Sequence, residues 1–204
     1  MIRCAKPLGE INARHDWVAE VRRYLVDPVE SVMDIGCGIR PQPYILAKGT
    51  HYLVDPHGPY LDRAAADWPH GTQPRCWTII ADWRRAVDIT APDSVDIVFL
   101  LDVIEHLPKE EGRELLERTI PIARKQVVLL TPLGLLPQAA LEGSDQWGFS
   151  TGANALQAHR SGWTPFDLDE RWGFLLSREF HRHDYAQVAL PCGPFDAWWG
   201  ILTK

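Results

Sequence analysis

Apolar positions along this chain fall into short continuous runs, and polar turns or segments with helical spacing separate them. Continuous runs such as residues 97–101 suit strands of a parallel sheet that is covered on both faces. The runs that we interpret as strands are 31–35, 51–54, 76–81, 94–101 and 126–131. Helical spacing or a helix-opening proline indicates helices at 12–26, 41–48 and 109–124. This alternation predicts a doubly wound α/β fold.

The pattern changes after residue 132. Residues 133–163 show no sustained period, and we interpret them as an insertion on the substrate side. Thr164 and Pro165 are typical of a helix start. The apolar runs at 173–183 and 196–202 have no helix between them, which predicts an antiparallel hairpin at one edge of the sheet.

We therefore expect a mostly parallel seven-stranded sheet with helices on both faces and an antiparallel C-terminal edge hairpin. The expected organisation is one domain made of a helical lead-in, a ligand-binding core, the insertion, and a final helix with the hairpin. Their respective bounds are 1–28, 30–132, 133–163 and 164–204.

Composition narrows the class of protein. The chain has 204 residues, enough for one substantial core, and its 46% hydrophobic and 24% charged residues are ordinary for a globular domain. No apolar run is long enough to cross a bilayer and the N-terminus lacks a secretory signal, so we expect a cytoplasmic protein. The four cysteines are far apart and are expected to be reduced thiols. A net charge of -6 disfavours a nucleic-acid partner.

The segment after the first predicted strand carries candidate chemistry. Asp34 precedes Gly36 and Gly38, which remove side chains where the backbone must bend and a ligand must come close. A dinucleotide fingerprint needs a further glycine three residues after Gly38, where this chain has Pro41. The turn therefore indicates a nucleotide-like cofactor of another kind, although by itself it also fits an ordinary tight loop.

Acidic residues follow the next predicted strands. Ligands bind beyond the carboxyl ends of parallel strands, so we expect Asp34, Asp55, Asp82 and Asp102 to lie near one another. Asp55 suits the two hydroxyls of a ribose, and Asp82 suits an adenine amino group with Trp83 covering the base. The alternatives are a turn aspartate before proline and a helix-capping aspartate beside a core tryptophan.

Together these segments resemble the class I S-adenosylmethionine-dependent methyltransferases over about residues 30–180. The resemblance rests on the turn at 34–38, on Asp55 and Asp82, on the fourth-strand segment 96–107, and on Thr131-Pro132. It implies S-adenosyl-L-methionine as the cofactor. The cofactor-binding residues that it implies or that adjoin its motifs are Asp34, Gly36, Cys37, Gly38, Arg40, Asp55, Pro56, Asp82, Trp83 and Asp102.

Arg40 departs from this family, which often has a third small residue at that position. A guanidinium suits carboxylate geometry, so Arg40 is expected to approach the methionyl carboxylate of the cofactor or an anionic substrate group. A loop arginine that faces solvent is the alternative.

The acceptor side has fewer signals. His106 follows the fourth strand and is the candidate general base, with Glu105 beside it; a structural histidine at the following helix is the alternative. We assign His159 a catalytic role and expect Arg160 to contact the acceptor. Trp163 and Trp147 are candidate pocket walls, or buried anchors of the loop. The spacing of the eight histidines indicates no metal site, and His181 with His183 is expected to be structural or on the surface.

The expected function is transfer of a methyl group to a hydroxyl or amine of a small-molecule acceptor, such as a saccharide or secondary metabolite. One alternative is a regulatory or assembly protein that binds the cofactor without transferring its methyl group. An NAD-dependent oxidoreductase is opposed by Pro41. We expect no nucleic-acid or membrane partner, and a monomer or homodimer.

Overall fold

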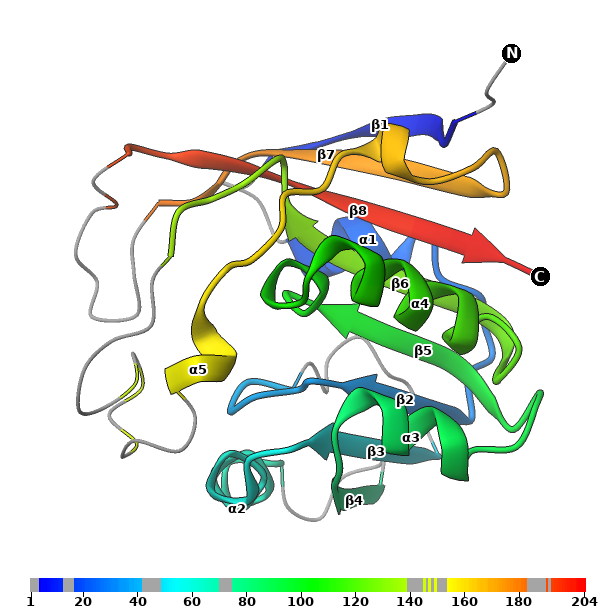
Figure 1. Cartoon of the computed structure of the whole chain (residues 1–204). Coiled ribbons are helices and arrows are strands. Elements are labelled where there is room, and N and C mark those ends of the chain that lie inside the picture. Colours follow the sequence, from blue (N-terminus) through cyan, green and yellow to red (C-terminus); the bar gives the residue numbers. More distant parts are fainter. Residues whose placement is uncertain are drawn as a thin grey trace. The chain divides into compact units, whose positions relative to one another are not determined.

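A computed structural model describes residues 4–12, 17–41, 49–69, 75–138, 145, 147, 149, 154–182, 190 and 192–204. Eight strands form one sheet in the order β1-β7-β8-β6-β5-β2-β3-β4 (Figure 1). The strands are β1 Lys6–Asn12, β2 Ser31–Ile35, β3 Thr50–Asp55, β4 Arg75–Ile80, β5 Val95–Leu101, β6 Ala123–Pro132, β7 Trp172–His181 and β8 Phe195–Thr203. The helices are α1 Trp17–Arg22, α2 Gly58–Ala66, α3 Trp83–Ile89, α4 Lys109–Thr119 and α5 Asn154–Gln157, with 3-10 turns η2 Ile104–His106 and η3 Pro165–Asp167.

The predicted α/β class and all seven predicted strands are confirmed, but the strand count is eight. The strand that the sequence pattern missed is β1, because its first five residues are exposed and show no apolar alternation. It pairs in parallel with β7, with a bulge between Pro7 and Gly9. Because β1 lies beyond β7, the C-terminal strands do not form the edge of the sheet, and that part of the prediction is wrong.

The helices differ more from the predictions. The sequence pattern did not predict α2 or α3, which span only nine and seven residues and are too short to show a sustained helical period. The helix predicted to continue to residue 124 ends at Thr119, and β6 begins at Ala123. The helix predicted at Thr164 is only the single turn η3, closed by a capping box between Thr164 and Asp167.

Two predicted helical segments are only partly described. Within the predicted helix 12–26, α1 covers Trp17–Arg22. Pro41 is not helical, and residues 42–48 of the helix predicted at 41–48 lie outside the described residues. Among the helices that the structure describes, none is long and apolar enough to cross a membrane.

The chain divides into two compact units. Unit 1 comprises Met1–Trp17, Asp102–Gly112 and Leu130–Gly200, and unit 2 comprises Val18–Leu101, Arg113–Leu129 and Ile201–Lys204. In unit 2, β2 lies between β3 and β5 and is parallel to both. Residues 95–100 of β5 are all buried, as expected for a strand covered on both faces. Figure 1 shows α3 in front of the strands of this unit and α1 behind them.

Unit 1 has a core rich in tryptophan. Trp163, Trp198 and Trp199 are fully buried. Their indole N–H groups donate to the carbonyl of Ile104, the carbonyl of Trp163 and the hydroxyl of Ser177, respectively. Each large ring therefore brings apolar area into the core while its polar atom keeps a hydrogen bond.

Candidate functional site

The glycine turn, residues 36–38, leaves β2 in a conformation that favours glycine. Gly36 has φ 74 and Gly38 has φ 55, both in the left-handed region, where a Cβ is costly. The backbone N–H groups of Gly36 and Cys37 donate to the carbonyl of Val54 at 2.7 and 3.2 Å. The turn is thus fastened to the end of β3.

Asp55 holds the same turn through its side chain. Its Oδ2 accepts from the N–H of Gly38 at 3.1 Å, and its Oδ1 accepts from the N–H of His57 at 2.8 Å. Burial raises the pKa of Asp55, and these two N–H donors partly oppose that shift. Each carboxylate oxygen has a second lone pair, so the group can still accept two ribose hydroxyls. The structure therefore joins the glycine turn and Asp55, two elements that lie 17 residues apart in the sequence.

Asp34, the residue before the last one of β2, lies beside a histidine that was not among the predicted site residues. His51 Nε2 is 3.8 Å from Asp34 Oδ2, and both side chains are almost completely buried. Burial, followed by the nearby charge of Asp55, raises the pKa of Asp34 to about 7. Burial lowers the pKa of His51 to about 3, and its ring meets Trp68 edge-on at 4.9 Å. The sequence signal for this contact was a histidine at the start of the apolar run 51–54.

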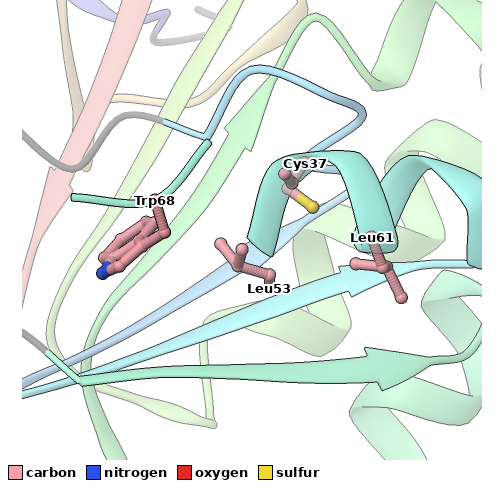
Figure 2. Close-up of a cluster of buried hydrophobic side chains, with 5 residues drawn as sticks. Cys37, Leu53, Leu61 and Trp68 are labelled. Carbon is pink, nitrogen blue, oxygen red and sulfur yellow. The ribbon is translucent and has the colours of Figure 1, made fainter. Parts of the chain in front are cut away.

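Cys37, in the middle of the glycine turn, has a buried side chain. Its side chain is 8% exposed and belongs to a buried cluster with Leu53, Leu61, Ala64 and Trp68. Figure 2 shows the sulfur of Cys37 among these side chains, between the turn, β3 and α2. Burial raises the pKa of this thiol well above its usual value. The thiol therefore packs in the core, and a ligand contact by Cys37 would use its backbone.

Asp82 and Trp83 lie as the alternative interpretation expects, as a helix-capping aspartate beside a buried tryptophan. Asp82 is the N-cap of α3 and accepts from the N–H of Arg85 at 2.8 Å. Trp83 is 7% exposed, and the guanidinium of Arg84 lies 4.3 Å from the centre of its ring. The ring is thus buried within unit 2 and has little surface to offer a base.

Ile80 is the apolar residue that the end of β4 does expose. It is the last residue of β4 and is 72% exposed. Its Cδ1 lies 3.4 Å from where a Cβ of Gly58 would be, so it adjoins the start of α2. Arg40 and Pro56, two further residues predicted to bind the cofactor, are exposed. A large apolar residue two positions before Asp82 was the sequence signal for this surface.

The acceptor-side residues lie in unit 1 and are organised around Glu105. This carboxyl group is 1% exposed, and its Oε2 accepts from the hydroxyl of Thr131 at 3.0 Å. The backbone carbonyl of Glu105 accepts from the N–H groups of Arg160 and Ser161 at 2.7 and 3.1 Å. Burial, and then the charge of Asp102, raises the pKa of Glu105 well above its usual value.

These backbone hydrogen bonds bring His159 beside His106. The two rings have their centres 4.7 Å apart and meet edge to face. His106 Nδ1 faces the carbonyl of Ala158 at 3.3 Å, and His159 Nδ1 faces the carbonyl of Leu136 at 2.7 Å. Burial is the main cause that lowers the pKa of both rings, to about 4 for His106. Both imidazoles are therefore neutral near pH 7.

Three predicted acceptor-side residues have different surroundings. Trp163 is fully buried and packs under Lys109, whose Nζ is 3.9 Å from the ring centre. Because it has no exposed surface, the ring anchors the loop instead of walling a pocket. Arg160 is exposed and donates to the carbonyl of Ala155 at 3.1 Å. The N–H of Trp147 donates to Asp145 Oδ1 at 2.9 Å.

Asp102 also belongs to unit 1, whereas Asp34, Asp55 and Asp82 belong to unit 2. It has φ 53, a left-handed conformation that is uncommon outside glycine. Its Oδ1 lies 3.9 Å from Nε2 of His181, the last residue of β7. Burial raises the pKa of Asp102. Of the four aspartates predicted to lie together, Asp34 and Asp55 do so within unit 2. Asp82 follows the neighbouring strand end, where the N–H of Ala81 donates to the carbonyl of Asp55 at 3.1 Å.

No protein-family model and no curated protein sequence matches the chain. Three solved structures are similar over most of its length. A didemethyltoxoflavin N1-methyltransferase from Burkholderia thailandensis, bound to its acceptor and S-adenosylhomocysteine, is 16% identical with a TM-score of 0.59, over 94% of this chain and 78% of its own. A magnesium protoporphyrin IX methyltransferase from Synechocystis PCC 6803, with bound SAM, is 16% identical with a TM-score of 0.56, over 94% and 80%.

The third is a SAM-dependent methyltransferase from Archaeoglobus fulgidus, which is 14% identical with a TM-score of 0.56, over 92% of this chain and 93% of its own. Several other matched structures are covered over only 43% to 54% of their length. At these identities the likeness shows the fold: the chain shares the architecture of all three enzymes.

Proposed function

We propose that this chain, which has the fold of class I methyltransferases, transfers a methyl group from S-adenosylmethionine to a hydroxyl or amine of a small-molecule acceptor. The observation that carries the proposal is the glycine turn bound to Asp55. Two left-handed glycines remove side chains from the turn, and the carboxylate that braces it retains lone pairs for a ribose. A close backbone turn beside a carboxylate acceptor suits a nucleoside cofactor.

The residues of unit 2 would hold that cofactor. Asp55 would accept the ribose hydroxyls, the backbone of residues 36–38 would approach the amino-acid part, and Arg40 would pair with its carboxylate. Asp82 retains the proposed adenine contact alongside its cap, and exposed Ile80 supplies apolar area for the base face. When bound, the sulfonium supplies an activated methyl group, so the protein's main contribution is alignment.

The residues of unit 1 would serve the acceptor. In the transfer, the acceptor oxygen or nitrogen forms a bond to the methyl carbon while the carbon–sulfur bond breaks and its electron pair stays on sulfur. The acceptor loses a proton, which would pass to His106, the candidate general base, and from there to solvent. His106 and His159 are neutral, so each can accept a hydrogen bond from that group, and Glu105 would orient it. Exposed Arg160 would contact an anionic part of the acceptor.

Small-molecule acceptors are supported by the structural neighbours. Two of them are named as methyltransferases of didemethyltoxoflavin and of magnesium protoporphyrin IX, which are both small molecules. The net charge of -6 opposes a polyanionic acceptor.

The proposal is tested first by titration calorimetry with S-adenosylmethionine, S-adenosylhomocysteine and NAD. We expect one site for each sulfur compound and none for NAD. Asp55→Asn should weaken binding at least about tenfold, because an amide nitrogen replaces one acceptor oxygen. Asp67→Asn is the matched control, since Asp67 pairs with Arg63 at the exposed end of α2. Absence of binding by the wild-type chain contradicts the proposal.

The second step is a methyl-donor turnover assay over a panel of hydroxyl and amine acceptors. Transfer to any of them supports the enzyme. Cofactor binding without transfer across the whole panel favours the regulatory alternative.

A further inference from the structure

We propose that Glu105, His106 and His159 form a binding site for a divalent transition-metal ion. Each of these residues has one ligand atom that lies within 4.8 Å of those of the other two. Two ligands of one such ion, each at about 2.1 Å, are separated by roughly 3 to 4 Å. Small side-chain movements therefore suffice to close the three groups on one ion. All three residues belong to unit 1.

The imidazoles are oriented as in metal sites. A carbonyl oxygen only accepts hydrogen bonds, so we assign the ring proton of His106 to Nδ1, facing Ala158, and that of His159 to Nδ1, facing Leu136. In that tautomer Nε2 keeps the lone pair that binds a metal. Ligand histidines usually have their second nitrogen fixed by a carbonyl or carboxylate in this way.

A buried oxygen of Glu105 gives an independent indication. Thr131 donates to Oε2, but Oε1 is buried with no partner among the N–H and hydroxyl donors of the described residues, and the Glu105 and Asp102 carboxyls share a hydrogen bond only when one of them is protonated. An unsatisfied buried polar atom destabilises the fold, and more so when the group is charged. A cation bound to Oε1 would remove this cost. The hydroxyl of Thr131 then acts as the outer hydrogen bond that orients the carboxylate.

The surroundings add negative charge and a further imidazole. Asp102 Oδ1 and His181 Nε2 lie 3.9 Å apart, and in the part of the chain that the structure describes neither atom has a hydrogen-bond partner. The carboxyl of Asp102 also affects the protonation of both Glu105 and His159, so it lies close to this group. It can serve as a fourth ligand or as an outer partner.

The donor set identifies the kind of ion. Mg²⁺ and Ca²⁺ prefer oxygen ligands throughout, whereas two imidazoles with a carboxylate suit Mn²⁺, Fe²⁺, Co²⁺ or Zn²⁺. Three protein ligands leave positions open for another molecule. Its use in the reaction rests on the proposed function and would replace the direct hydrogen bonds from the acceptor to the two imidazoles. With Nε2 of both rings on the ion, an acceptor oxygen bound at an open position would have a lower pKa and lose its proton more readily to water.

The test uses the whole chain, freed of metal by a chelator, and Co²⁺ or Zn²⁺ alone. Calorimetry should give one ion per chain, and Co²⁺ should develop the absorption of a nitrogen- and oxygen-bound ion. His106→Asn and His159→Asn should each weaken binding at least about tenfold, because the amide keeps a donor toward the carbonyl but replaces the imidazole Nε2. Glu105→Gln should do the same while retaining an acceptor for Thr131.

His57→Asn is the control substitution, since His57 lies in unit 2, outside this group. Melting curves without metal show whether each variant is folded. Absence of stoichiometric binding by the wild-type chain overturns the proposal, as does unchanged affinity in folded His106→Asn and His159→Asn variants. Because the readout needs no methyl donor, failure of S-adenosylmethionine binding in the calorimetry above bears on the proposed function alone.

Discussion

The buried pair of Asp34 and His51 predicts an unusual dependence of stability on pH. Asp34 has a pKa of about 7 in the folded chain and about 3.8 when unfolded. Between these values the folded state keeps a proton that the unfolded state loses, so stability falls as pH rises. His51 has a pKa of about 3 when folded and about 6.5 when unfolded. Over that range the unfolded state binds the extra proton, so stability rises with pH.

The two effects oppose each other between about pH 4 and 6. Each pKa unit corresponds to about 1.4 kcal/mol, so each group alone changes the free energy of unfolding by roughly 2–3 kcal/mol across this range. In the wild-type chain the two slopes nearly cancel. Asp34→Asn leaves the slope of His51, so its stability relative to wild type should increase from pH 4 to pH 6. His51→Asn leaves the slope of Asp34, so its relative stability should decrease.

Urea unfolding followed by tryptophan fluorescence at pH 4, 5 and 6 measures these differences. The double variant is the control, because it lacks both groups and should show a wild-type slope. Subtracting the wild-type curve removes the contributions of all other titrating groups that the substitutions leave unaffected. Stability differences that stay constant with pH in both single variants would refute the assigned shifts and their cause in burial.

Two further substitutions test packing and the cofactor turn. Gly112→Ala places a Cβ 2.4 Å from Trp163 Cζ2, so we expect a net loss of about 1–2 kcal/mol in chemical unfolding despite alanine's better helix propensity. Gly58→Ala, whose nearest contact is an ordinary 3.4 Å, should not lose stability, and equal losses in both would contradict the steric argument. Arg40→Ala should raise the dissociation constant of S-adenosylmethionine at least several-fold in calorimetry, while Arg171→Ala should not; an unchanged constant for Arg40→Ala would remove its role.

The sequence predicted most strands of this fold from apolar runs that match buried positions, as in β2, β5 and β6. Strand β4 was also predicted from its apolar run, although none of its residues is buried. Residues 31–35 were predicted and are observed as β2, and β5 differs from its prediction by one residue. The pattern fails at β1, whose first five residues are exposed and show no apolar alternation. Strand β1 is held by hydrogen bonds to β7 while most of its side chains face outward, so no apolar period marks it.

The part of the candidate site that lies at the ends of two adjacent parallel strands was predictable. The glycine turn and Asp55 follow adjacent strands, and parallel pairing brings their ends together. The group formed by Glu105, His106 and His159 was not predictable as a metal site from spacing. His159 reaches His106 only because the Glu105 carbonyl accepts two N–H groups from residues 160 and 161. Contacts of this kind depend on a loop conformation that carries no periodic signal.

The hydrogen bonds from Gly36 and Cys37 to Val54 make the position of the glycine turn depend on the register between β2 and β3. The partner of Asp34 across the β2–β3 ladder is Leu53, and the next pair is Ile35 with Val54. A slip of β3 by one position would carry Val54 away from the turn and move Asp55 to the opposite face of the sheet. Cofactor affinity should therefore act as a sensitive reporter of correct strand register, and an insertion or deletion within β3 should abolish binding even where the chain still folds.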